Sequence, residues 1–322
     1  MRLWINHFIV VGVLLLVFII ALIYRGADAV NGVLWGKDQF FCDFSITDCS
    51  INTQSINVKL GMYDINNTYS SNTSLAVDHY FISLATINRE DLARNLKSSS
   101  DKNRWPLVTV EPWARDSSST ETLLEDILDR KYDEDILSVC SEFKEFDKPL
   151  FIRFGHEMER VTGRYPWAVS DSEKYIAAYR YFVQKCKESF TQGYYVWSPA
   201  GDKGLESYFP GNDVVDYVGL SIYGLDQFDK DTYGYFRSFS ENLGEKYERV
   251  KTYDKPIMIA ELGVVGVPDF QREWLKAGLE NMDIFPLMKI VVYFNAKDNE
   301  GAWGEKYGIP DWRIRNDVFD SQ

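Results

Sequence analysis

The chain is poor in the residues on which several kinds of chemistry depend. Its 322 residues include three histidines and four cysteines, and no CxxC pair or Cys/His cluster is present, which argues against a zinc site. The stretch "HEMER" at 156–160 begins like the HExxH motif of metalloproteases, but Arg160 stands where the second histidine is required. The chain also lacks a G-x-S-x-G elbow and a glycine-rich phosphate loop after the first predicted strand, which excludes a serine esterase and a dinucleotide-binding fold. We expect neither a metal nor any other cofactor.

Positive charge is also scarce. Lys and Arg number 35 against 48 Asp and Glu, so the net charge is −13, and a nucleic-acid partner is not expected because phosphate binding needs a basic face. Aromatic residues, in contrast, are abundant: 9 Trp, 20 Tyr and 20 Phe. Flat rings suit the apolar faces of sugars, although an aromatic-rich core is the more ordinary interpretation of such a composition.

The first residues differ in character from the remainder. Residues 8–24 carry no charge and are long enough to span a thin bilayer, so residues 1–29 are predicted to form a transmembrane signal anchor. Arg2 precedes this run and places the N-terminus in the cytoplasm. The "ADA" at 27–29 has the form of a signal-peptidase site, so cleavage is the alternative. The protein is therefore expected to be membrane-anchored with its bulk outside the cytoplasm, periplasmic or extracellular, or to be secreted if it is cleaved.

The four cysteines fit export without proving it. Cys42 and Cys49 lie in a predicted stalk over residues 30–56, where a disulfide could close a small loop. Cys140 and Cys186 fall in predicted helices and are interpreted as ordinary buried thiols.

The remaining residues, 57–322, alternate between strand and helix patterns. The predicted strands lie at 57–63, 78–84, 105–111, 149–154, 193–198, 216–222, 256–261 and 289–295, and most are apolar on both faces, as parallel strands covered by helices are. Amphipathic helices are predicted at 120–129, 132–146 and 172–189, the last with Ser170 or Asp171 as its cap. Eight such strands predict an α/β fold, a single (β/α)8 TIM barrel, whose chemistry gathers at the C-terminal ends of the strands.

Two glutamates stand at such ends. Glu157 follows the fourth predicted strand, and Glu261 ends the seventh in "PIMIAELG". Both side chains are expected to enter the same mouth from across the barrel. Two carboxyl groups that face each other over a cleft are what glycoside hydrolysis requires, because one protonates the leaving oxygen and the other attacks the anomeric carbon or guides water to it.

Several ordered motifs resemble glycoside hydrolase family 26, the β-mannanase family. "KPLFIRFGHEMERVTGRYPW" resembles its acid/base region, and "YYVWSPAGDKGLESYFPGNDVVDYVGLSIYG" is similar to its fifth and sixth strands. "KPIMIAELG" resembles its nucleophile strand, and "YFNAKDNEGAWGEKYGIPDWRI" its final strand and loop. The likeness runs from about residue 61 to residue 314.

The resemblance implies a role for each matching residue. Glu157 would be the general acid/base and Glu261 the nucleophile of a retaining mechanism. His156 would contact the substrate or the nucleophile site, Arg153 would lie beneath as a charge partner, and Tyr223 would be hydrogen-bonded to Glu261 and hold it ionised. Trp303 would form the floor under the scissile sugar, and the cleft would also be lined by Trp167, His79 and Trp113. A structural ion pair inside the barrel is an equally good interpretation of Arg153.

A retaining pair has its carboxyl groups about 5–5.5 Å apart, so an ionised Glu261 is expected to raise the pKa of Glu157 and keep it protonated. Two departures from the family pattern concern the substrate. Glu159 and Arg160 replace the usual Asn-Gly after His-Glu-Met, and Ala200 stands where Asn is common.

The predicted activity is that of an endo-acting β-glycanase, with β-1,4-mannan as the first polymer to test and mixed-linkage β-glucan and β-1,3-xylan as alternatives. An anchored enzyme would also have exopolysaccharide synthesis or secretion machinery as a neighbour. A non-catalytic polysaccharide-binding or assembly protein on the same barrel is the rival hypothesis.

Overall fold

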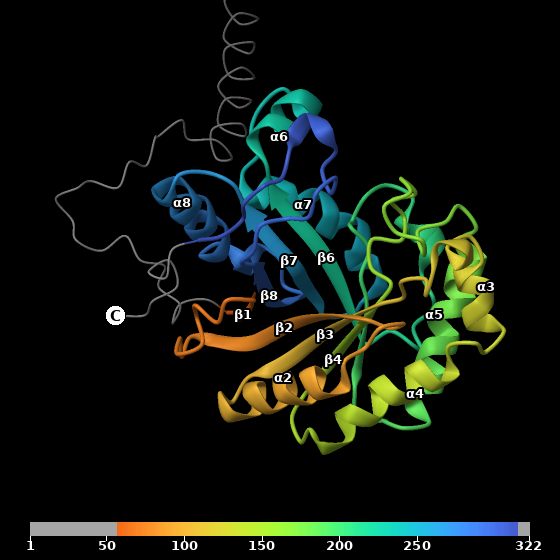
Figure 1. The fold of residues 1–322 in the computed structure, drawn as a ribbon. Coiled ribbons are helices and arrows are strands. Elements are labelled where there is room, and N and C mark those ends of the chain that lie inside the picture. The colour runs from red at the N-terminus through yellow and green to blue at the C-terminus, as the bar shows by residue number, and fades with distance from the viewer. Residues whose placement is uncertain (1–56, 315–322) are drawn as a thin grey trace, which may run out of the picture. The chain divides into compact units, whose positions relative to one another are not determined.

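The computed structural model describes residues 57–314, and within them eight parallel strands close into a barrel in sequence order (Figure 1). The strands are β1 (Lys59–Tyr63), β2 (Leu75–Ser83), β3 (Trp105–Glu111), β4 (Phe151–Phe154), β5 (Tyr194–Trp197), β6 (Tyr217–Gly224), β7 (Ile257–Val264) and β8 (Met288–Phe294). The predicted (β/α)8 barrel and all eight predicted strands are thus confirmed. The predicted anchor, the stalk, and Cys42 with Cys49 lie outside the described residues.

Helices cover the outside of the barrel. They are α2 (Arg89–Asp101), α3 (Leu123–Leu128), α4 (Asp133–Glu142), α5 (Ser172–Lys187), α6 (Asp226–Tyr233), α7 (Phe239–Val250) and α8 (Pro268–Leu279). The side chain of Asp171 accepts the N–H of Lys174, so it caps α5, as one of the two proposed candidates. Ser238 and Glu241 cap α7 reciprocally. No helix of the described part is long and apolar enough to cross a membrane.

Two apolar cores follow from the alternation of strand side chains. The larger core lies between the strands and the surrounding helices. The smaller one fills the barrel with the inward side chains Val77, Leu107, Phe151, Val196, Met258, Ala260, Ile290 and Val292. The interior is therefore packed with side chains, as is usual for this fold, whose sites lie at the strand ends.

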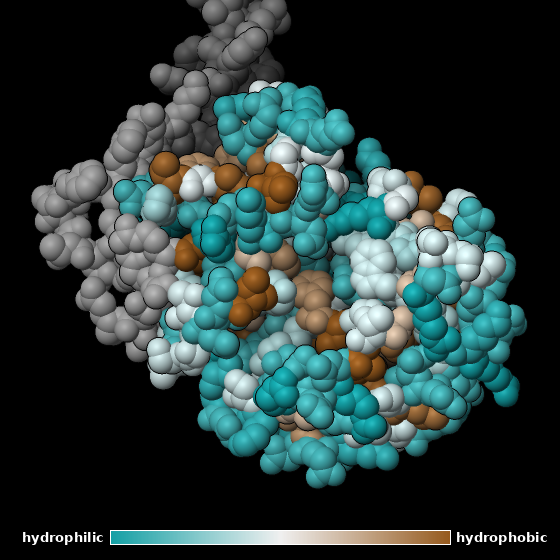
Figure 2. All heavy atoms as spheres, in the orientation of Figure 1, coloured by the Kyte–Doolittle hydropathy of each residue, from teal (hydrophilic) through white to brown (hydrophobic). Residues whose placement is uncertain are grey.

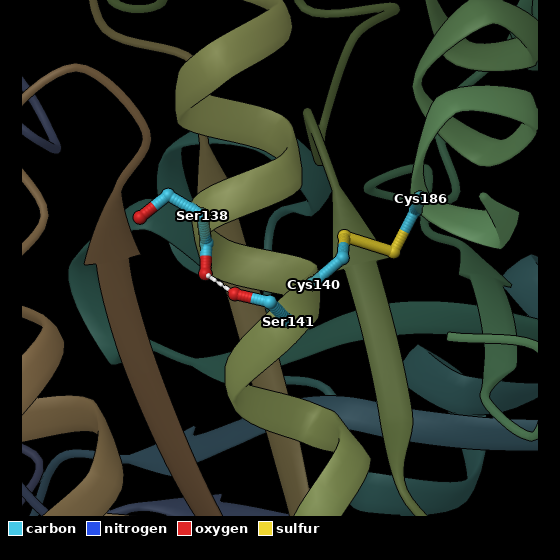
Figure 3. The surroundings of a disulfide bond; sticks show 4 residues. All are labelled: Ser138, Cys140, Ser141 and Cys186. Carbon is cyan, nitrogen blue, oxygen red and sulfur yellow. Dashed lines mark hydrogen bonds between the residues drawn. A yellow bond between two sulfur atoms is a disulfide. The ribbon is translucent and has the colours of Figure 1, made fainter. Parts of the chain in front are cut away.

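Cys140 and Cys186 form a disulfide between α4 and α5 (Figure 3). The interpretation of these residues as ordinary buried thiols is therefore wrong. The helices pack against the barrel side by side and bring the two Cα atoms to 5.4 Å, within the range that a disulfide needs. This proximity depends on tertiary packing and leaves no trace in the spacing of the cysteines.

Loss of this disulfide is expected to lower the free energy of unfolding by about 4 kcal/mol, because it closes a long loop in the unfolded chain. The two cysteines are 46 positions apart. Urea denaturation of the Cys140→Ala/Cys186→Ala variant, with and without reductant, checks this. Reductant should destabilise the wild type and leave the variant unchanged; equal stability of both proteins would contradict the expectation.

Candidate active site

Glu157 lies in a tight turn directly after β4. Gly155 and Glu157 both have positive φ, 53° and 54°, a conformation that a non-glycine residue adopts only when its surroundings hold it there. The N–H of Glu157 donates to the carbonyl of Ser198 at 2.8 Å, which fixes this turn to the end of β5. The Glu157 side chain is buried, with the residue 3% exposed.

Glu261 lies in β7 at an irregularity of the sheet. Ile259 pairs with Leu220 of β6, and the next pair is Glu261 with Ser221, so β7 carries one extra residue at this point. Its pairing with β8 shifts over the same stretch. Met258 and Ala260 point into the barrel, so strict alternation would turn residue 261 outward. The bulge instead directs Glu261 towards the barrel mouth.

Two donors hold the Glu261 carboxylate from different strands. Arg153 of β4 donates through Nη1 to Oε1 at 2.6 Å, and the hydroxyl of Tyr223 of β6 donates to Oε2 at 2.7 Å. Both predicted contacts are confirmed. Burial and the negative charge of Glu261 raise the pKa of Tyr223 well above its usual value, so this hydroxyl remains a donor. Charge-assisted bonds of this kind stabilise a carboxylate and fix its direction.

Glu157 and Glu261 share one polar environment. Nε2 of His156 lies 3.9 Å from Oε1 of Glu261, which agrees with the predicted place of His156 at the nucleophile site. The charges of both glutamates act on Arg164 and on Tyr165, and Arg153 acts on Glu157 as well as on Glu261. The strand ends therefore bring the two glutamates into the same mouth.

The pKa of Glu157 is lowered, and the prediction that it is raised is wrong for the structure as it stands. Burial raises the pKa of this carboxyl, but the guanidinium groups of Arg160 and Arg164 act in the opposite direction and outweigh burial. The expected rise in the pKa of Glu157 rested on the negative charge of Glu261 alone. Both arginines belong to the loop after β4, and nothing in their spacing indicated that they turn back towards Glu157.

His79 and Trp167 lie beneath the mouth and not on its surface, contrary to the prediction that they line the cleft. His79 is 2% exposed and its Nε2 lies 2.7 Å from Oγ1 of Thr109. Trp167 is fully buried, and its indole N–H donates to the carbonyl of His156 at 2.7 Å. Burial and the charge of Arg153 lower the pKa of both His79 and His156 well below the usual value, so both rings are neutral.

Trp303 and Trp113 are partly exposed, as side chains that line a cleft must be. Trp303 packs edge-on against Tyr223 at 5.7 Å between ring centroids, and its N–H donates to Asp298. Trp303 therefore lies beside Tyr223, the residue that donates to Glu261, which suits its predicted role under the scissile sugar. The space-filling view shows a hollow on the face between β2 and β6, where apolar and near-neutral side chains are recessed behind hydrophilic rims (Figure 2).

Two carboxyl groups of the mouth escaped the sequence analysis. Glu111 ends β3 and accepts the indole N–H of Trp113, and burial together with the charge of Glu261 raises its pKa. Asp298, in the segment after β8, accepts the indole N–H groups of Trp303 and Trp312. Glu111 ends a predicted strand, so its position in the sequence offered a signal, whereas Asp298 lies in a loop and offered none.

A further aromatic cluster, from strands β1, β2 and β8, was also missed. Tyr63 stacks on Phe294 at 4.9 Å and meets Phe81 edge-on at 5.0 Å. All three rings are partly exposed; Tyr63 and Phe294 end their strands, and Phe81 lies two positions before the end of β2. Among the described residues, no group of three His, Cys, Asp or Glu side chains is placed to hold a metal ion.

The model of glycosyl hydrolase family 26 matches residues 111–280, which include both glutamates. The chain belongs to this family. Among curated relatives, Endoglucanase H of Acetivibrio thermocellus is 25% identical over 223 residues, which cover 65% of this chain and 23% of that protein. A β-1,3-xylanase of Alcaligenes sp. is 24% identical over 211 residues, 61% of this chain and 40% of that protein. The chain thus spans less than half the length of these relatives.

Solved structures of the family show the same fold. A GH26 β-mannanase from Bacteroides ovatus aligns with a TM-score of 0.55 at 15% identity, covering 84% of this chain and 86% of that one. A modular endo-β-1,4-mannanase from Cellulomonas fimi aligns with a TM-score of 0.57 at 15% identity, covering 76% and 68%. At this identity the likeness concerns the fold alone.

Proposed function

We propose that this family 26 member is a retaining β-glycanase in which Glu261 is the nucleophile and Glu157 the general acid/base. The single observation that carries the proposal is the arrangement around Glu261. A bulge turns this carboxylate into the mouth, Arg153 and Tyr223 fix its two oxygens, and Nε2 of His156, the residue before Glu157, lies 3.9 Å from Oε1.

The chemistry follows from these positions. One oxygen of Glu261 attacks the anomeric carbon while the protonated form of Glu157 gives its proton to the departing glycosidic oxygen, which leaves an ester between the sugar and Glu261. Because the arginines lower the pKa of Glu157, acidic pH favours this protonated form. Glu157, now ionised, takes a proton from water as that water attacks the anomeric carbon and releases Glu261. Two inversions retain the anomeric configuration. Trp303 provides an apolar face on which the sugar ring can rest during both steps.

We propose β-1,4-mannan as the first substrate, in endo mode. The names of the curated relatives favour two alternatives, a glucan and β-1,3-xylan. Two of the departures, Glu159 and Arg160, lie in the loop after β4 and bond to the segment after β5, and the third, Ala200, is buried in that segment. The relevant experiment incubates the purified full-length protein with mannan, glucomannan, lichenan and β-1,3-xylan and follows reducing ends and the anomer first formed.

The outcomes separate the hypotheses. Release of short oligosaccharides with retained configuration from one polymer supports the proposal and names the substrate. Inverted products would exclude a covalent step at Glu261. Tight binding to a polymer by a folded protein that releases no reducing ends would favour the polysaccharide-binding rival.

We also propose that this domain acts outside the cytoplasm, next to the machinery that makes or secretes an exopolysaccharide. The disulfide between Cys140 and Cys186 supports this place, because such bonds persist in oxidising compartments. The residues predicted to anchor the protein lie outside the described part. Fractionation of the source cells, with protease added to intact cells, tests the location; a protein found only in the protected soluble cytoplasmic fraction would refute it.

A further inference from the structure

The turn that carries Glu157 is bound to the segment after β5 by the two residues that depart from the family pattern. Oε1 of Glu159 accepts the N–H groups of Gly201 and Asp202 at 2.9 and 3.1 Å. Nε of Arg160 donates to Oδ2 of Asp202 at 2.6 Å. These side chains therefore form one connected unit with the residues that follow β5.

Arg160 also reaches back to Glu157. Its Nη1 lies 3.4 Å from Oε2 of Glu157, three positions earlier in the chain. The guanidinium thus stands between two carboxylates, one of them the proposed acid/base and the other Asp202. The Glu157 side chain is 4% exposed and that of Arg160 is 33% exposed, so solvent reaches this contact from the side of the arginine only.

We propose that Arg160 is a positioning residue that holds Glu157 against the segment after β5 and decides the pH range over which Glu157 delivers its proton. The role in catalysis rests on the proposed function, in which Glu157 is the acid/base. The contact itself and its effect on the carboxyl do not depend on that role.

The segment that Arg160 uses as its anchor is itself rigidly held. Nζ of Lys246, from α7, donates to the carbonyls of Ala200 and Ser221 at 2.8 and 2.6 Å. Arg249, one turn further along α7, donates to the carbonyl of Gly201 at 2.6 Å. Burial and the charge of Arg160 lower the pKa of Lys246 to about 8. Asp202 is therefore a fixed point from which Arg160 can position Glu157.

Several other charged or titratable groups face Glu157. The cations are Arg153 of β4, Arg160 and Arg164 of the loop after β4, and Lys246 of α7. The acids are Glu159, Asp202 and, in the same mouth, Glu261 of β7, and the phenols are Tyr165 and Tyr223. Among these arginines, Arg160 contacts the Glu157 carboxylate directly. Asp202 acts on Glu157 with the opposite sign, because a second negative charge disfavours ionisation.

The two substitutions are expected to change the pKa of Glu157 in opposite directions. Removing the positive charge of Arg160 should raise the pKa of Glu157, and removing the negative charge of Asp202 should lower it. The side chains of Arg160 and Asp202 are 33% and 43% exposed, so water weakens both effects. We expect a shift of about 1 pH unit upward for Arg160→Gln and a smaller shift downward for Asp202→Asn.

The experiment measures the titration of the Glu157 carboxyl directly, by carbon-13 NMR of glutamate-labelled full-length protein, with the signal assigned by Glu157→Gln. The wild type is compared with Arg160→Gln and Asp202→Asn. Arg94→Gln is the matched control, because Arg94 also pairs with carboxylates but lies exposed on α2, away from the mouth. It should leave the titration unchanged.

Shifts of opposite sign in the two variants support the proposal, and a purely structural role would not produce them. An unchanged titration in both, or shifts in the same direction, overturns it. If Arg160→Gln does not fold, Asp202→Asn alone tests the proposal. A lower pKa of Glu157 in that variant supports the proposal, and an unchanged or higher pKa overturns it.

Where the protein hydrolyses a glycan, the high-pH limb of kcat/KM should move with the NMR value. If it does not, Glu157 is not the acid and the proposed function fails while the contact stands.

Discussion

Replacing Glu261 with alanine is expected to abolish hydrolysis, with kcat reduced by about 10⁴-fold or more, because no other group can form the covalent intermediate. The described structure offers no substitute at that position. Arg153 and Tyr223 aim at this carboxylate and cannot attack carbon themselves. Initial rates on the polymer identified by the screen, together with a thermal melt to show that the fold is intact, make the measurement.

The melt matters because the variant leaves Arg153, a fully buried cation, without its nearest partner. Glu261→Gln keeps the shape of the side chain and should be equally inactive. Glu280→Ala, an exposed glutamate just after α8, is the control and should retain full activity. Substantial hydrolysis by a folded Glu261→Ala protein would remove this residue from the mechanism.

Replacing Glu157 with alanine is expected to reduce turnover of polysaccharide by about 10²–10⁴-fold, the usual contribution of a positioned general acid/base. Part of the activity should return when azide is added, since a small anion can occupy the space of the missing carboxylate and attack the glycosyl-enzyme without base catalysis. The product would be a glycosyl azide of retained configuration. Rates with and without azide, and NMR of the product, make the measurement.

Glu111 provides the most informative comparison. Its carboxyl also lies in the mouth and also feels the charge of Glu261, but it accepts a hydrogen bond from Trp113. Azide should not rescue Glu111→Ala. Rescue of that variant in place of Glu157→Ala would transfer the acid/base role to β3.

The sequence predicted most of the site because barrel strands place their last residues in one mouth. Glu157, Arg153 and Tyr223 stand at or near the ends of predicted strands, and the predicted contacts of Arg153 and Tyr223 with Glu261 are confirmed. The failures concern side chains whose direction depends on loops. Trp167 follows Glu157 by ten positions and was expected to line the cleft, yet it is fully buried and donates its indole N–H to the carbonyl of His156.

The amino-acid sequence by itself determined the barrel, its strand order and the motifs that place two glutamates at strand ends. The physical reason is that strands apolar on both faces, alternating with helices apolar on one face, can bury their apolar surfaces in few arrangements. Only the tertiary structure decided which way certain groups point. The bulge in β7 reverses the direction of Glu261, and the segment after β5 draws Arg160 against Glu157. The packing of α4 on α5 likewise joins Cys140 to Cys186. Each of these depends on a neighbour distant in the chain, and no local pattern of residues encodes such a contact.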